Sequence, residues 1–394
     1  MLNFTFHSPT KVVFGKGAEL STVDEIKEFG GSRVMIVYGG GSVVKSGLLG
    51  TIQEQLEKEN IPYTVLGGVQ PNPRLSMARD GVKQAIDFGA DFVLAVGGGS
   101  VIDTAKGIAL GAANPETDIW SFWTREVVPK RSIPVGVVLT ISAAGSETSD
   151  SAVLTNEETG SKRGLSTQLN RPKFAIMNPE LTYTLPKYQI MCGIVDIMMH
   201  TLERYFTPTE GNEFTDEVAE ALLRVVIKNG SIAVNDPHDY HAMSELMWCG
   251  SISHNGLTGL GAVADFATHQ LGHELSAKFD VAHGASLSTV WGSWAKYCYK
   301  EKPERFARFG QKVWGIEKDT AEETALAAIE KTVSYFASIG APTCFTELGI
   351  GIQDDETLKK LAERCMYFGQ RSSVGQFKVI DQEAAYEIYK LANR

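Results

Sequence analysis

The residues of this chain best suited to chemistry include a carboxylate and an imidazole, Asp196 and His200, in the second half of the sequence. They are four residues apart within a predicted helix over residues 187–206. Side chains at this spacing project from the same face of a helix, so both can reach one ligand. The chain has eight histidines, and a single pair of this kind is more often structural than metal-binding.

A second pair of potential ligands favours a metal site. His269 and His273 have the same spacing within a predicted helix over residues 264–277, and His283 follows ten residues after His273. One carboxylate and several imidazoles suit Fe²⁺, Zn²⁺ or a similar borderline divalent ion. Because both pairs and His283 lie in the same half of the chain, the sequence predicts a metal centre there.

A glycine-rich run lies between a predicted strand, residues 92–96, and a predicted helix, residues 101–112. Glycines here allow backbone N–H groups to close on an anion, and a helix N-terminus adds unpaired donors and the positive end of its dipole. The run predicts a pyrophosphate site, although it matches neither Walker A nor G-x-G-x-x-G. A tight turn that only packs helix on strand is the alternative. The run consists of Gly97, Gly98, Gly99 and Ser100.

A second glycine run follows the first full strand, residues 33–38, at the edge where α/β sheets usually bind ligands. It consists of Gly39, Gly40, Gly41 and Ser42. NAD-binding proteins commonly place a carboxylate at the end of such a strand to hold the ribose 2′-hydroxyl, and that carboxylate would repel a 2′-phosphate. Gly39 occupies this position here, which favours NADP(H) over NAD(H), with Ser42 and Lys45 available to the extra phosphate.

A third segment, residues 140–148, places small hydroxyl side chains directly after a predicted buried strand, residues 133–139. Taken alone, it is most simply read as an ordinary polar loop. Beside two glycine runs, it becomes a candidate third part of the nucleotide site.

The elements that must position these residues divide the chain in two. The first half alternates short β-branched strands with helical periodicity, which predicts an α/β fold with a doubly wound, Rossmann-like parallel sheet. Beyond residue 185 the strand pattern ends and helices such as residues 325–339 follow. We therefore expect a dinucleotide-binding α/β domain at residues 1–185 and an all-helical metal-binding domain at residues 186–394. The expected strands are residues 33–38, 63–66, 92–96 and 133–139, and the expected crossover helices are residues 44–59, 75–88 and 101–112.

The composition is that of a soluble globular protein, with 43% hydrophobic and 21% charged residues. A formal charge of −10 argues against nucleic acid as a partner, because a phosphate backbone calls for basic surfaces. We expect no secretion signal and no membrane-spanning segment, and the five scattered cysteines indicate reduced thiols. These features predict a cytoplasmic protein with no nucleic-acid or membrane partner.

Several segments resemble the iron-containing, or group III, alcohol dehydrogenase family. The resemblance is carried by residues 265–277 with His283, by residues 193–200 and by the glycine run at 97–100, and it extends over essentially the whole chain. Residues 38–42 and 265–277 are most similar to the branch that contains NADPH-dependent butanol dehydrogenases and broad aldehyde reductases.

The resemblance implies a role for each matching residue. His273 would face the reacting carbon rather than the ion. Many relatives have a threonine where this chain has Ala144, which is therefore left out of the expected site. The implied metal ligands are Asp196, His200, His269 and His283. The implied nucleotide-binding residues are Gly39, Gly40, Gly41, Ser42, Asn72, Gly97, Gly98, Gly99, Ser100, Asp103, Thr140, Ser142 and Lys162.

The resemblance also implies an activity. The chain would be a metal-dependent NAD(P)H alcohol dehydrogenase or aldehyde reductase for short to medium aliphatic substrates, with NADPH preferred and Fe²⁺ or Zn²⁺ as the ion. Hydride transfer to an aldehyde carbon builds negative charge on the oxygen, which such an ion stabilises as a Lewis acid. The family resemblance further implies a homodimer joined near residues 4–14. A glycerol dehydrogenase-like enzyme and a non-catalytic nucleotide- and metal-binding protein are the alternatives.

Some residues carry narrower hypotheses. His273 could exchange the proton of the reaction, because an imidazole titrates near neutrality. Asp265, four residues before His269, either orients that imidazole or faces solvent. A set of large apolar side chains either lines the substrate site or packs in the core, and it consists of Trp120, Phe122, Trp123, Met198, Met199 and Phe266.

Overall fold

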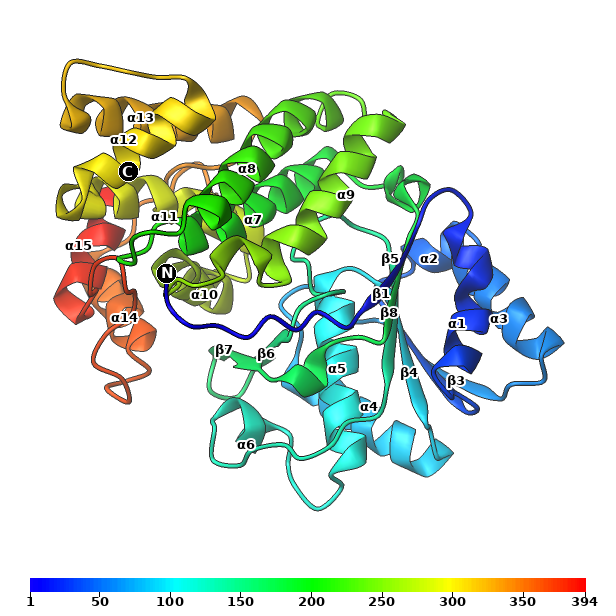
Figure 1. Ribbon diagram of the computed structural model, residues 1–394. Helices are drawn as coiled ribbons and strands as arrows, with labels where there is room; N and C mark the ends of the chain where they lie inside the picture. Colours follow the sequence, from blue (N-terminus) through cyan, green and yellow to red (C-terminus); the bar gives the residue numbers. More distant parts are fainter. The chain divides into compact units, whose positions relative to one another are not determined.

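The computed structural model describes residues 1–394 as two compact units (Figure 1). The first unit comprises residues His7–Leu185. The second comprises residues Pro186–Arg394 together with Met1–Phe6. The sequence had placed residues 1–6 in the α/β domain, and in the structure they belong to the helical unit instead.

Backbone hydrogen bonds explain this difference. The amino group of Met1 donates to the carbonyl of Glu210 at 3.0 Å, and the Leu2 N–H donates to the carbonyl of Gly261 at 2.8 Å. Both acceptors lie in the helical unit, more than two hundred residues along the chain, so no local sequence pattern predicts these hydrogen bonds.

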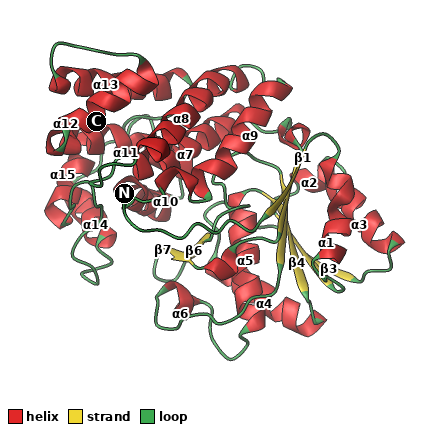
Figure 2. Cartoon of the chain, in the orientation of Figure 1, coloured by secondary structure: helices red, strands yellow, loops and turns green.

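The α/β unit contains a six-stranded parallel sheet, which confirms the expected fold class (Figure 2). The four expected strands lie next to one another in this sheet, where each is paired over most of its length. In spatial order, the strands are β1 (Lys11–Phe14), β8 (Phe174–Met177), β5 (Val135–Leu139), β4 (Phe92–Gly97), β2 (Val34–Tyr38) and β3 (Tyr63–Leu66).

Helices cover both faces of the sheet. Crossovers that reverse direction after β3 place α1 and α3 on one face and α4 and α5 on the other (Figure 1). Alternate residues of β2 and β4, such as Ile36 and Leu94, join the core beneath α1 and α3. The helices of this unit are α1 (Thr22–Glu28), α2 (Ser42–Lys45), α3 (Leu48–Lys58), α4 (Leu75–Phe88), α5 (Gly99–Ala113) and α6 (Trp120–Trp123).

One expected helix, residues 44–59, is divided in the structure into α2 and α3. Gly47 separates them with a φ of +82°, a left-handed conformation that glycine adopts without a Cβ penalty. Three further strands were not predicted from the sequence. They are β8 and the antiparallel hairpin of β6 (Ser151–Asn156) and β7 (Ser161–Ser166).

The second unit is entirely helical, and none of its helices is both long and apolar enough to cross a membrane. Its long helices α7 and α8 carry buried faces of ten or more residues each, so most of their stability comes from packing. The helices are α7 (Lys187–Tyr205), α8 (Glu213–Ala233), α9 (Tyr240–His254), α10 (Ala267–Phe279), α11 (His283–Cys298), α12 (Pro303–Phe309), α13 (Ala321–Ser338), α14 (Asp355–Cys365) and α15 (Gln382–Ala392).

A buried lysine on α5 organises the loop that follows β5. The ammonium group of Lys106 donates to the carbonyls of Ser146 and Ser151 at 2.7 Å each and to the Ser146 hydroxyl at 2.8 Å. That hydroxyl in turn donates to Asp103 at 2.6 Å. Burial lowers the pKa of Lys106 to about 8, against the opposing charge of Asp103. The polar loop expected at residues 140–148 is therefore anchored to the helix that begins at the glycine run.

We predict that Lys106→Met destabilises the α/β unit by about 3 kcal/mol, because it leaves buried carbonyl groups and Asp103 without their cation. Urea unfolding followed by circular dichroism measures the change. Lys83→Met, on an exposed position of α4, is the matched control and should change stability by no more than about 0.5 kcal/mol. Equal effects of the two substitutions would contradict this account of Lys106.

Candidate metal centre and nucleotide-binding residues

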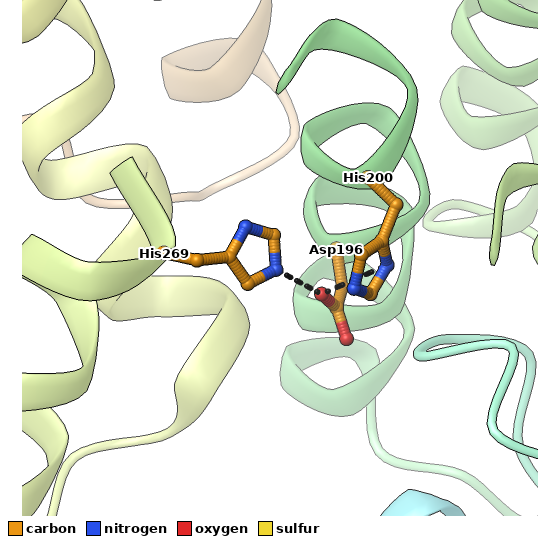
Figure 3. Close-up of side chains that lie close together, drawn as sticks. All are labelled: Asp196, His200 and His269. Carbon is orange, nitrogen blue, oxygen red and sulfur yellow. Dashed lines mark ion pairs between the residues drawn. The ribbon is translucent and has the colours of Figure 1, made fainter. Parts of the chain in front are cut away.

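Helix α7 carries the first two candidate ligands. Asp196 and His200 are 5% and 4% exposed, and they lie one turn apart on a helix that is buried along most of its length. Their side chains point toward the same space, as expected from the spacing of four residues (Figure 3).

Helix α10 brings a third candidate ligand against this pair. His269 Nε2 lies 3.7 Å from Asp196 Oδ1, and His200 Nδ1 lies 3.5 Å from the same oxygen. Figure 3 shows the three side chains converging from two helices. Their potential ligand atoms all lie within 4.8 Å of one another. Groups this close can bind one ion.

The chemistry of these atoms fits a divalent cation. Asp196 Oδ1, His200 Nδ1 and His269 Nε2 are all buried and form no hydrogen bond within the chain. The distances from Asp196 Oδ1 to the two imidazole nitrogens exceed the usual N–H···O distance of about 2.9 Å. Buried polar atoms without partners are costly, and an ion bound between them would satisfy all three.

The two imidazoles have opposite electrostatic environments. Burial above all, reinforced by His254 and His269, lowers the pKa of His200 well below its usual value, so this ring is neutral and ready to bind a metal. Burial also acts to lower the pKa of His269, but the charge of Glu203, the contact with that carboxylate and the nearby charge of Asp196 outweigh it and raise that pKa to about 9.

A fourth candidate ligand comes from the start of α11. His283 Nε2 lies 3.8 Å from Asp196 Oδ1. The next residue is Gly284, where a Cβ would lie 2.1 Å from the carbonyl oxygen of Cys192 on α7. The absence of a side chain at Gly284 therefore allows α11 to approach α7 closely enough for His283 to reach Asp196.

The carboxylate that contacts His269 is Glu203, not Asp265. Glu203 lies one turn beyond His200 on α7, accepts the backbone N–H of His269 at 3.0 Å and contacts its Nδ1. Asp265 is 5% exposed and accepts backbone N–H groups of Gln376 and Phe377, so it neither orients His269 nor faces solvent. The sequence signal for Glu203 was its position on the same helical face as Asp196 and His200.

Two more histidines lie beside this cluster. The His273 ring centroid is 5.2 Å from that of His283 and 6.1 Å from that of His269, which places it at the edge of the cluster. The His254 ring packs edge-on against His200 with centroids 3.9 Å apart. No sequence signal marks His254, because it lies on a different helix, α9, without a partner at helical spacing.

The glycine runs lie where the carboxyl ends of adjacent parallel strands meet. Residues 39–42 follow β2, residues 97–100 connect the last residue of β4 to the start of α5, and the loop with Thr140 and Ser142 follows β5. The N–H of Thr140 donates to the carbonyl of Gly97 at 3.2 Å, which joins two of these segments. Helix α5 begins at Gly99 without a side-chain cap on its first N–H groups.

The glycines at this position also meet a packing requirement. A Cβ on Gly98 would lie 2.2 Å from Ile141 Cγ2, and a Cβ on Gly99 would lie 3.1 Å from Ala144 Cβ. These glycines therefore also allow close packing, which was the alternative role for the glycine run. Here the loop after β5 packs against the start of α5. The small side chain at Ala144 belongs to the same close contact.

Three predicted nucleotide-binding residues have partners within the chain. Lys162, on β7, donates to Asn72 Oδ1 at 2.9 Å, and both side chains are buried. These two predicted residues, ninety positions apart in sequence, are thus brought together. Asp103 is held by the Ser146 hydroxyl and by the N–H of Val153, so its carboxylate organises the loop around the candidate site.

Comparison with known proteins assigns a family to this arrangement. The profile of the iron-containing alcohol dehydrogenases matches residues 9–179, and the profile of the Fe-containing alcohol dehydrogenase family, C-terminal region, matches residues 190–393. The chain belongs to the iron-containing alcohol dehydrogenase family. It is therefore an oxidoreductase of a family that uses NAD(P) and a divalent metal.

Relatives of known name match over almost the full length. The NADH-dependent butanol dehydrogenase A of Clostridium acetobutylicum is 40% identical over 99% of both chains. The probable NADH-dependent butanol dehydrogenase 1 of Bacillus subtilis is 38% identical over 99% of both chains. The NADPH-dependent aldehyde reductase YqhD of Escherichia coli is 35% identical over 100% of both chains.

Solved structures share the fold. The crystal structure of an NADH-dependent butanol dehydrogenase A from Thermotoga maritima has a TM-score of 0.96 and 37% identity, and covers 100% of this chain and 99% of its own. The structure of YqhD from Escherichia coli has a TM-score of 0.94 and 34% identity, with 99% of both chains covered.

We predict that Gly284→Ala weakens metal binding by roughly 10- to 100-fold, because the new methyl group forces the start of α11, and His283 with it, away from α7. Titration with Zn²⁺ in competition with a chromophoric chelator measures the affinity. Gly292→Ala, on the same helix and facing only the Val333 side chain, should reduce stability without reducing affinity. Equal metal affinity of the two variants would contradict the proposed role of Gly284.

Proposed function

We propose that this protein is a metal-dependent NAD(P)H alcohol dehydrogenase or aldehyde reductase that interconverts short to medium aliphatic aldehydes and primary alcohols. The observation that carries the proposal is the buried cluster of Asp196, His200 and His269, whose facing atoms have no hydrogen-bond partners. Full-length similarity to enzymes named butanol dehydrogenase and aldehyde reductase supports the same reaction.

The proposed metal ligands are the three residues of this cluster and His283. A divalent ion held there would act as a Lewis acid toward the oxygen of the aldehyde or alcohol. Four protein ligands leave room for a substrate oxygen only if the ion accepts five or more ligands, which favours Fe²⁺ while leaving Zn²⁺ as a second candidate. In aldehyde reduction, the substrate carbon accepts a hydride from the nicotinamide, and the substrate oxygen accepts a proton.

We infer that the nucleotide binds at the carboxyl ends of β2, β4 and β5, where the glycine runs lie. The start of α5 offers uncapped N–H groups to the pyrophosphate. Gly39, directly after β2, offers no carboxylate to a ribose 2′-hydroxyl, which supports NADPH over NADH. The named relatives include both NADH- and NADPH-dependent enzymes.

The substrate class rests on fewer side chains than the sequence suggested. Met198 and Met199 are fully buried within α7, and Phe122 and Trp123 belong to the core of the α/β unit, so these four stabilise the fold. Phe266 is partly exposed, and its ring centroid lies 5.3 Å from that of His269. An apolar ring beside the metal cluster favours an aliphatic substrate over a charged one.

We further propose a cytoplasmic homodimer. Leu2, Phe4 and Phe6 expose between 44% and 52% of their surface, and β1 is an edge strand of the sheet. An exposed edge strand offers backbone groups for pairing with a second copy, and exposed apolar side chains offer surface that such a copy would bury. Analytical ultracentrifugation of the protein measures the oligomeric state, and a monomer at micromolar concentration would contradict this proposal.

We predict that the anaerobically purified protein contains about one divalent ion per chain and oxidises NADPH on addition of butanal, with a higher kcat/KM for NADPH than for NADH. Chelation should abolish the activity, and Fe²⁺ or Zn²⁺ should restore it. Elemental analysis and initial rates at 340 nm provide the measurements. Binding of NADPH without its oxidation would support a non-catalytic protein, and a strong NADH preference would contradict the interpretation of Gly39.

We also predict that His273→Ala lowers kcat by roughly 100-fold while the metal content stays full, because His273 would no longer exchange the proton of the reaction. Steady-state rates between pH 6 and 9 measure kcat and its dependence on pH. His241→Ala, at an exposed position of α9, is the control and should leave kcat and its pH dependence unchanged. An unchanged pH profile in His273→Ala would exclude this role.

A further inference from the structure

A buried carboxylate without an assigned role lies next to the metal cluster. Glu203 is the third acidic or imidazole residue on one face of α7, after Asp196 and His200, and its side chain is fully buried. Its two oxygens have a single partner residue, His269: one oxygen accepts the backbone N–H at 3.0 Å, and the other contacts Nδ1 of the ring.

This contact determines which ring nitrogen of His269 is available to bind a metal ion. A carboxylate oxygen only accepts hydrogen bonds, so the ring nitrogen that faces it must carry the hydrogen. Nδ1 is therefore the donor toward Glu203, and Nε2, 3.7 Å from Asp196 Oδ1, is the ring nitrogen left for an ion. Because the same carboxylate also holds the backbone N–H, it restrains both the ring and the first turn of α10.

The charge of Glu203 is not compensated by a lysine or arginine. Its ion pair is formed with His269. The neighbouring Arg204 donates instead to the carbonyls of His200 and Ser253 and lies over the ring of Phe266. A divalent ion bound by Asp196 alone among the acids would leave one positive charge in a buried site, and a second carboxylate beside a ligating imidazole neutralises it.

We propose that Glu203 is a positioning residue of the metal centre, which orients His269 for binding through Nε2 and supplies the second negative charge that a divalent ion needs there. This inference rests on the proposed metal site. It adds a specific requirement to that site: α7 contributes two ligands and, one turn further on, the carboxylate that holds the ligand from α10.

Glu203→Gln tests the proposal, because the amide keeps the size of the side chain, removes the charge and retains only one oxygen to accept two donors. Glu220→Gln is the matched control: Glu220 is also fully buried in the helical unit, where it binds Arg308 and the Tyr205 hydroxyl. The probe is Co²⁺ added to the metal-free full chain, measured by competition with a chelator and by its ligand-field absorption spectrum.

We expect Glu203→Gln to bind Co²⁺ about 10- to 100-fold more weakly than the wild type and to show a changed absorption spectrum, because His269 is no longer held in place. Glu220→Gln should lose stability without either change. Glu203→Asp keeps the charge but shortens the reach, and it should lose less affinity than Glu203→Gln.

Two results distinguish failure of this inference from failure of the proposed function. If the wild type binds Co²⁺ but Glu203→Gln has the same affinity and spectrum, Glu203 does not position His269 and the inference is wrong. If the wild type itself binds no divalent ion, the proposed metal site is wrong as well.

Should Glu203→Gln fail to fold, Glu203→Asp decides by the gain in melting temperature on Co²⁺ addition, which follows affinity. A gain equal to that of the wild type would overturn the inference.

Discussion

The burial of Asp196 is the constraint on which the rest of this structure depends. A carboxylate that is 5% exposed, with one oxygen that forms no hydrogen bond, needs a cation, and three imidazoles converge on that oxygen at 3.5 to 3.8 Å. At these distances the imidazole nitrogens form no hydrogen bond with the Asp196 oxygen, so they do not compensate for its burial. Helices α7, α10 and α11 are therefore arranged around a point where an ion would lie, and Gly284 provides the close approach that this arrangement requires.

The α/β unit contains a buried charge of the opposite sign. Lys106 is surrounded by carbonyl oxygens of one loop and is linked through Ser146 to Asp103. This network holds the segment after β5 against the start of α5, at the carboxyl edge of the sheet. Both units thus use a desolvated charged group on a helix to position segments distant in sequence. Such groups stabilise a fold only when every partner is in place, which makes the surrounding geometry specific.

Much of the fold could be predicted because its signals are local. Helix α4 begins and ends where its periodicity predicted, and β3 also matches its expected residues. Two errors have local physical causes as well: Gly47 interrupts one expected helix with a positive φ, and the polar sequence of β7 does not show the apolar strand pattern. The pairing of residues 1–6 with the helical unit depends on acceptors far along the chain.

The sequence by itself determined the kinds of donor atoms and their spacing along each helix, because side chains four residues apart share a face whatever the tertiary fold. It therefore predicted Asp196 with His200. Only the tertiary structure decided which carboxylate meets His269. Asp265 is near in sequence but binds backbone N–H groups, whereas Glu203, sixty-six residues away, contacts the ring. Which helices lie side by side depends on how their buried faces pack, and the spacing of residues along one helix does not predict this packing.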